Sequence, residues 1–154
     1  MRSLLGAALV FAVVASTEGA PRHGTFRVHL EANSRDGLVF AQPIRSITGK
    51  NVFIERMAWL SERDVKAFYP YRAADGSYGA LLKLDDHCRT ALDTLSVEHR
   101  GAYLYVFLNG RPLTELQIDR RVSDGTIYLA SGLAAADIQL MNKDWKLIRA
   151  KKKK

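Results

Sequence analysis

The sequence predicts a single α+β domain, and three observations carry this prediction. Several short stretches alternate apolar and polar residues, which is the two-residue side-chain period of a β-strand. Three other segments place apolar residues three and four positions apart, as amphipathic helices do. Turn sequences that contain Asp, Asn, Ser and Gly separate these segments. Because strands and helices are mixed along the chain, we expect a largely antiparallel sheet with the helices packed on one face.

Length and composition are those of a soluble globular protein. Of the 154 residues, 47% are hydrophobic and 25% are charged, which is close to the average for folded domains. We expect one domain over residues 25–148. Cys88 is the only cysteine, so no disulfide forms within the chain, and pairing between chains is the alternative to a free thiol. Its helical spacing with Leu92 and Leu95 predicts a buried thiol.

The first residues have the pattern of a secretory signal peptide. Arg2 precedes an apolar run over residues 4–14, which is shorter than the about 20 residues that span a bilayer. Val13 and Ala15 favour cleavage before Ser16, and Gly19 gives a second site at 19/20. A buried N-terminal helix is the alternative. We therefore expect a signal peptide at 1–15, a flexible segment at 16–24, and a periplasmic or secreted protein.

The first half of the domain is predicted to contain strands and one helix. Residues 26–30 and 51–59 alternate apolar and polar side chains, and a turn at 34–37 precedes a short return strand at 38–40. Ser61 is a good helix N-cap, and Asp64 follows at the third helical position, where a carboxylate stabilises the first turn. Together with Val65 and Phe68, these residues predict a helix that Pro70 ends.

The second half is predicted to alternate strands with two helices. A strand at 78–84 leads to Asp85 or Asp86, either of which would cap a helix that ends before Gly101. The apolar run 102–108 is the best candidate for a central strand. Its aromatic stripe is expected in the core beneath the helices, and it consists of Tyr103, Tyr105 and Phe107.

Turn signals define the rest of the chain. Asn109-Gly110 predicts a tight hairpin whose return strand covers residues 113–118. A turn at 123–125 leads into a strand at 126–129, which Gly132 ends. The final predicted helix has one apolar stripe, which consists of Ile138, Met141, Trp145 and Ile148.

Basic residues are concentrated at the C-terminus. The formal net charge is +7, yet residues 16–148 hold 17 basic and 16 acidic residues. Because this body is nearly neutral, a dedicated nucleic-acid surface is not expected. The tail at 149–154 is expected to contact an anionic envelope surface weakly, with improved solubility as the alternative. Its basic residues are Arg149, Lys151, Lys152, Lys153 and Lys154.

The sequence has no recognisable motif for catalysis, a cofactor or a metal. Asp85, Asp86 and His87 form the densest polar cluster, but three adjacent residues do not converge on one ion, and helix capping accounts for the aspartates. The four histidines are scattered, and no nucleophile elbow or phosphate-binding glycine loop is present. We expect no cofactor and no metal, while a catalytic site assembled from distant residues stays open.

One loop has the residue types of a recognition surface. Tyr69, Tyr71 and Tyr78 flank residues 70–77, and Arg72 lies inside this loop. Aromatic residues and Arg dominate the energetics of protein interfaces, so these four residues are the candidates for partner binding. The alternative is that the tyrosines fold back onto the core.

Residues 78–142 resemble the head portion of the first periplasmic domain of SecD, which belongs to the SecD/SecF accessory complex of the preprotein translocase. The matching segments come in the same order: GALLKLD at 79–85, LSVEHRG at 95–101, YLYVFLNG at 103–110 and VSDGTIYLASG at 122–132. No segment approaches the about 20 apolar residues of a transmembrane helix. The resemblance therefore implies a stand-alone version of this domain.

The residues and the resemblance together indicate an exported, non-catalytic domain that binds a protein or peptide partner in the cell envelope, with a link to protein export. An exposed sheet edge would accept an extended segment by strand addition. Two alternatives stay open: a small hydrolase or metal-dependent enzyme with a dispersed site, and an envelope-tethered structural domain that uses its lysine tail.

Overall fold

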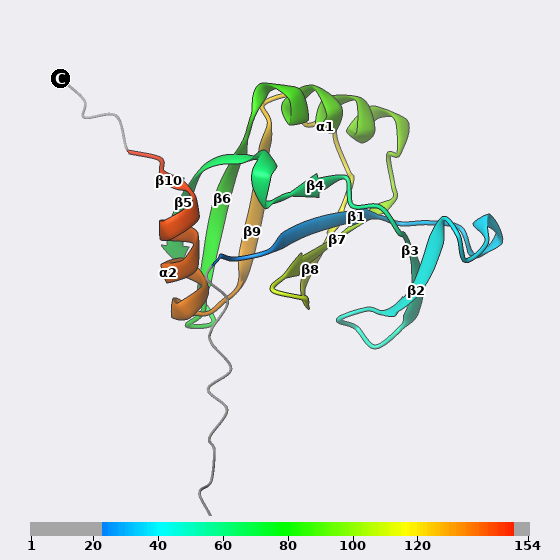
Figure 1. Cartoon of the computed structure of the whole chain (residues 1–154), viewed down its shortest axis with the longest axis horizontal. Helices are drawn as coiled ribbons and strands as arrows, with labels where there is room; N and C mark the ends of the chain where they lie inside the picture. Colours follow the sequence, from blue (N-terminus) through cyan, green and yellow to red (C-terminus); the bar gives the residue numbers. More distant parts are fainter. Residues whose placement is uncertain (1–22, 150–154) are drawn as a thin grey trace, which may run out of the picture.

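The computed structural model describes residues 23–149 and confirms the α+β class (Figure 1). The predicted signal peptide, its cleavage sites and the four lysines of the tail lie outside the described residues. In chain order the elements are β1 (Phe26–Leu30), η1 (Ser34–Asp36), β2 (Ala41–Arg45), β3 (Asn51–Glu55), β4 (Leu60–Ser61), η2 (Glu62–Asp64), β5 (Val65–Arg72), β6 (Tyr78–Leu84), α1 (Asp86–Glu98), β7 (Tyr103–Leu108), β8 (Arg111–Gln117), β9 (Thr126–Leu133), α2 (Ala135–Asp144) and β10 (Lys146–Leu147).

The strands are arranged in two four-stranded sheets and one hairpin, where the sequence predicted one sheet. The first sheet has the order β4-β1-β7-β8 and is antiparallel throughout. The second has the order β10-β5-β6-β9, in which only β10 runs parallel to its neighbour. The β2–β3 hairpin lies at the end of the molecule opposite α2 (Figure 1). As predicted, the apolar run 102–108 supplies an inner strand, β7.

The apolar sides of the two sheets belong to one core, which the helices complete. α1 contributes Leu92 and Leu95, and α2 contributes Met141. The ring of Trp145, just after α2, meets the rings of Phe26 and Phe68 edge to face, with 6.0 Å between centroids in both pairs. Both sheets supply fully buried side chains, among them Val28, Leu30, Leu82, Val106, Leu129 and Leu133.

The turn and capping signals of the second half are confirmed. Asn109 and Gly110 have φ values of 51° and 77°, which are the positive values that a tight two-residue hairpin needs. Asp85 caps α1, because its carboxylate accepts a hydrogen bond from the Cys88 N–H at 2.8 Å. Gly101, just beyond α1, has a φ of 92°. Cys88 is a free thiol and is buried, as its spacing predicted.

The helix predicted after Ser61 is wrong. The Asp64 carboxylate does accept a hydrogen bond from the Ser61 N–H at 2.7 Å, but this cap stabilises only the single 3-10 turn η2. The chain continues as β5, which directs Phe68 into the core. Pro70 is tolerated in this strand because β10 pairs with β5 only at residues 67 and 68, so the missing N–H breaks no ladder on that side.

The strand predicted at 51–59 ends at Glu55, and three other element boundaries also differ from the sequence predictions. Residues 38–40 form an exposed turn, and the return strand β2 begins at Ala41. β9 continues through Gly132, where a φ of 95° accompanies an irregular register opposite β6. α2 ends at Asp144, and the extended segment after it includes Ile148, whose N–H donates to the Phe68 carbonyl at 2.8 Å.

The β2–β3 hairpin covers the side of the first sheet that faces away from the core. His29 Nδ1 donates to the Glu55 carbonyl at 2.8 Å, and the Ile47 N–H donates to the Glu115 carboxylate at 2.8 Å. Tyr105 is in register with both His29 and Glu115 and is only 5% exposed. The predicted place of the Tyr103, Tyr105 and Phe107 stripe beneath the helices is therefore wrong, because the alternate residues of β7 take the core side.

Candidate binding cleft between two sheet edges

The candidate site is a cleft between the outer edges of β8 and β9. Each of these strands pairs with a neighbour on one side only, β8 with β7 and β9 with β6. The two edges meet at Gly132, where a Cβ atom would lie 3.4 Å from Leu113 Cδ1. Farther along both strands, between residues 116–117 and 126–128, they border a cleft of about 650 Å³. Two backbone edges of the sheets therefore open onto one hollow.

The floor of the cleft is apolar and its rim is polar. Leu92 of α1, Leu104 of β7 and Ile127 of β9 line the floor, and all three are buried. The loop 119–124 forms the rim between β8 and β9. The apolar floor is the part that resembles a binding pocket, and the rim is more polar than is usual for one.

Two contacts with α1 hold the rim loop in place. Arg121 binds the Asp93 carboxylate through two nitrogens, at 2.5 and 2.8 Å, and this pairing keeps the pKa of Asp93 below its usual range. The Val122 N–H donates to Ser96 Oγ at 2.9 Å. The bidentate geometry fixes the direction of the guanidinium group as well as its distance. These contacts with α1 therefore fix the position of the loop that borders the cleft.

Tyrosines cover the outward side of the second sheet beside the cleft. Tyr128 lies at the cleft and is 58% exposed, and its ring stacks on that of Tyr71 with 5.5 Å between centroids and 12° between planes. The Tyr71 hydroxyl donates to the Leu129 carbonyl at 2.5 Å. Burial, reinforced by Tyr128, raises the pKa of Tyr71 above its usual range. We call Tyr69, Tyr71 and Tyr128 the tyrosine face.

The four residues predicted to bind a partner divide between two sides of the second sheet. Tyr69 and Tyr71 belong to the tyrosine face, and Tyr69 is 48% exposed. Arg72 and Tyr78 are register partners on the other side, where the guanidinium carbon of Arg72 lies 5.1 Å from the Tyr78 ring centroid and its NH1 donates to the Tyr78 hydroxyl at 3.0 Å. Tyr128 was missed, because a lone tyrosine in a strand gives no sign of which neighbours it meets.

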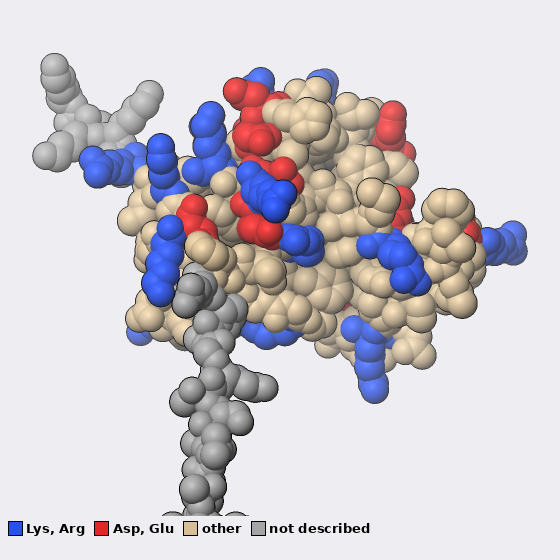
Figure 2. Space-filling view, viewed as in Figure 1, with Lys and Arg blue, Asp and Glu red and all other residues tan. Residues whose placement is uncertain are grey.

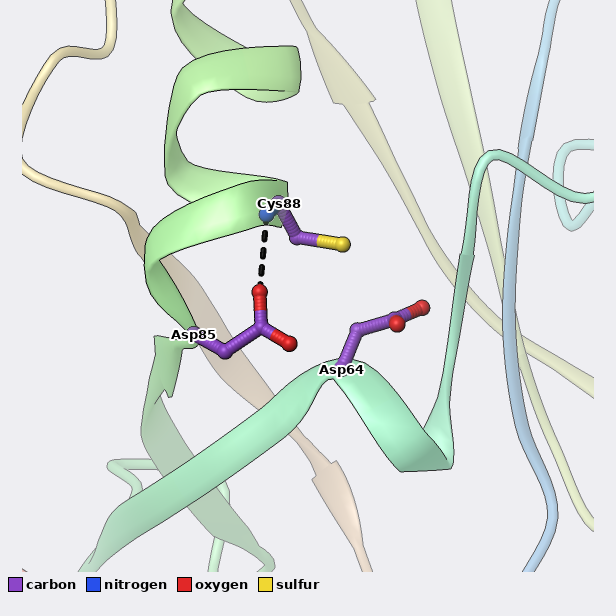
Figure 3. A group of neighbouring side chains, drawn as sticks. All are labelled: Asp64, Asp85 and Cys88. Atoms are coloured by element: carbon purple, nitrogen blue, oxygen red, sulfur yellow. Dashed lines mark hydrogen bonds between the residues drawn. The ribbon is translucent and has the colours of Figure 1, made fainter.

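One group of side chains has the proximity of a metal site. Possible ligand atoms of Asp64, Asp85 and Cys88 lie within 4.8 Å of one another (Figure 3). Both carboxylates already accept backbone hydrogen bonds, Asp85 from Cys88 and Asp64 from Ser61. Burial, followed by the nearby carboxylates, raises the pKa of Cys88 to about 12, so the thiol is protonated at neutral pH. Capping of η2 and α1 accounts for this arrangement.

Arg149 is the part of the predicted anionic-surface site that the structure describes. It is exposed and lies with Lys143 and Lys146 around a shallow hollow that follows α2. Figure 2 shows Lys and Arg side chains gathered at this end of the molecule. The contact of the tail with an anionic surface remains a prediction.

Comparison with known proteins identifies the fold. No protein-family model and no curated protein matches the chain. A solved structure of SecDF, described as a membrane component that enhances protein export, has a TM-score of 0.57 at 13% sequence identity, over 83% of this chain and 69% of that one. A second, of SecDF in a super-membrane-facing form, has a TM-score of 0.55 at 12% identity, over 81% of this chain and 19% of that one. The fold is therefore SecD-like, and the likeness extends well beyond residues 78–142.

The described residues contain no helix that is both long and apolar enough to cross a membrane.

Proposed function

We propose that this protein is an exported, non-catalytic domain of the cell envelope that binds an extended polypeptide segment by strand addition in the cleft between β8 and β9. The observation that carries the proposal is the pair of one-sided strands that border a hollow with an apolar floor and a polar rim. A peptide in this cleft would pair its backbone with an open edge and bury alternate side chains. The link to protein export rests on the SecD-like fold and on the predicted signal peptide.

The geometry favours β9 as the strand that receives the peptide. Its consecutive residues face opposite ways, so Ile127 lies on the cleft floor and Tyr128 on the outer side. An added strand has the same two-residue period. The inward side chains of the bound peptide would lie near Leu104, and its outward side chains would lie beside Tyr128. The preferred ligand is therefore an unfolded segment with small apolar residues at every second position.

The direct test uses peptides whose side chains stay the same while their backbone changes. The probe is a ten-residue peptide of alternating Val and Thr with Lys at both ends, titrated into the protein by calorimetry. Two further peptides are N-methylated at one or the other set of alternate residues. Because only one set faces the strand edge, we expect one of the two to bind at least about tenfold more weakly, since each lost backbone hydrogen bond costs on the order of 1 kcal/mol.

A matched pair of protein variants locates the site. Tyr128→Ala removes an aromatic ring at the cleft, and Leu147→Ala removes a comparably exposed apolar side chain from β10, at the opposite edge of the same sheet. We expect weaker binding by several-fold for the first variant and unchanged binding for the second. Equal affinity of both N-methylated peptides and the unmodified peptide would rule out strand addition. Equal effects of the Tyr128→Ala and Leu147→Ala variants would place the peptide elsewhere on the sheet.

A further inference from the structure

A second surface lies at the opposite end of the molecule from α2 and takes no part in the cleft. Four large apolar side chains project from the turn before β2 and the segment after β3: Leu38 is 68% exposed, Val39 76%, Phe40 71% and Met57 83%. We call these four residues the apolar protrusion. Side chains this exposed stand clear of their own fold, and a group of them marks an interaction site.

The turn that carries the protrusion is held by its own backbone. The Phe40 N–H donates to the Gly37 carbonyl at 3.2 Å, and the Phe40 carbonyl accepts from the Arg56 N–H at 2.7 Å. The Arg56 guanidinium donates to the Leu38 carbonyl at 2.7 Å. Backbone groups that are already paired lose little when water is removed. Three of the turn's backbone groups, the Phe40 N–H and the Leu38 and Phe40 carbonyls, therefore keep their partners when the side chains enter a medium of low polarity.

Charge around the protrusion favours an anionic surface. Residues 33–57 hold four basic residues, Arg35, Arg45, Lys50 and Arg56, and two acidic ones. Both carboxylates have donors within the protein: Asp36 accepts from the Asn33 N–H at 3.0 Å, and Glu55 accepts from Trp59 Nε1 at 2.6 Å. Figure 2 shows basic side chains at the hairpin end of the molecule. The net charge of residues 33–57 is +2: Arg35 and Arg56 adjoin the apolar residues in the chain, and Arg45 and Lys50 lie at the loop end of the hairpin.

We propose that the apolar protrusion docks onto a bilayer that contains anionic lipids. Leu38, Val39, Phe40 and Met57 would enter the boundary between headgroups and acyl chains, while Arg35 and Arg56 would contact the phosphates. A convex group of flexible apolar side chains fits a fluid lipid surface, which needs no complementary shape. Apolar insertion together with basic residues is the pairing that gives reversible surface binding.

The test is sedimentation with vesicles of equal parts phosphatidylglycerol and phosphatidylcholine, using the protein purified after export. The test variant replaces the three consecutive residues: Leu38→Ser, Val39→Ser and Phe40→Ser. We expect the partition coefficient to fall at least about tenfold, because several bulky side chains no longer leave water. Arg35→Glu should weaken binding several-fold at low salt. Vesicles of phosphatidylcholine alone should bind the parent protein several-fold less.

The matched control is Ile47→Ser, which removes a 55% exposed apolar residue from the loop that joins β2 and β3. It should bind like the parent protein. All variants should keep the parent melting temperature, because the replaced side chains are exposed. Unchanged sedimentation of the triple variant would overturn the proposal. An equal loss in the Ile47→Ser control would also overturn it, as would absence of vesicle binding by the parent protein. The apolar protrusion would then be assigned to a protein partner.

Discussion

The outward sides of the two sheets carry similar residues but differ in what covers them. In the first sheet Tyr105 points away from the core and is 5% exposed, because the β2–β3 hairpin crosses over it. In the second sheet Tyr128 also points away from the core and is 58% exposed. Two tyrosines in similar strand positions thus have opposite environments. The difference shows that burial of these tyrosines depends on where a distant hairpin is placed.

The largest expected effect separates these two tyrosines. Tyr105→Ala would leave a cavity beneath the hairpin and should lower the free energy of unfolding by about 3 kcal/mol, as for other buried aromatic residues. Tyr128→Ala would lose only the stacking on Tyr71 and should cost less than about 1 kcal/mol. Denaturant unfolding of both variants measures the difference. Similar losses of unfolding free energy in the two variants would mean that the outward sides of the two sheets are covered to a similar extent.

The sequence predicted local features of the second half well. The cap of α1 was narrowed to Asp85 or Asp86, and Asn109-Gly110 was predicted to form a tight hairpin, because both signals act within a few residues. The same reasoning failed at Ser61, where a real cap stabilises one turn and a strand follows. A capping box carries no information about how far a helix extends. The β-branched and aromatic residues of 65–71 were the signal for the strand.

The candidate cleft was harder to predict than the elements around it. The sequence indicated an exposed sheet edge, but β8 and β9 belong to different sheets, and their approach at Leu113 and Gly132 has no local signature. Tyr69 and Tyr71 are candidates because of their residue type; the structure stacks Tyr71 on Tyr128 and places Tyr69 on the same side of the sheet, across β6 from β9. Arg72 and Tyr78 were chosen for the same reason, yet the strand period puts them on the other side.

A smaller loss of stability is expected at Gly79, which lies beneath the Tyr71 ring in the second sheet. Tyr71 lies over Gly79, its register partner in β6, and a Cβ atom at Gly79 would come within 2.3 Å of the Tyr71 ring. Gly79→Ala should therefore displace the ring, break its bond to the Leu129 carbonyl and lower the free energy of unfolding by about 1–2 kcal/mol.

The double variant tests the cause of this loss. Once Tyr71→Ala has removed the ring, adding Gly79→Ala should cost almost nothing, so the two changes together should cost clearly less than the sum of the single changes. Denaturant midpoints of the four proteins complete the cycle. If the two effects simply add, contact with Tyr71 is not the reason for glycine at position 79.

The smallest expected effect concerns the C-terminal tail, which follows the second sheet directly. β10 forms the edge of that sheet beside β5, and Ile148 supplies the last large apolar side chain before the four lysines. Residues 151–154 are all lysine and offer no apolar side chain to dock onto the fold, so deleting them should leave the melting temperature almost unchanged. Binding to anionic vesicles should weaken, because each basic residue near such a surface contributes about 1 kcal/mol, and high salt should reduce this contribution.

The same deletion decides whether the tyrosine face is open in the whole chain. Lysines that lay over Tyr69 or Tyr128 would shield the rings and gain cation–π contacts. Their removal would then lower the melting temperature and increase the rate at which tetranitromethane modifies these tyrosines. We expect neither change. A clear rise in modification would show that the tail covers the second sheet much as the hairpin covers the first, and that a peptide must displace the tail before it reaches the cleft beside Tyr128.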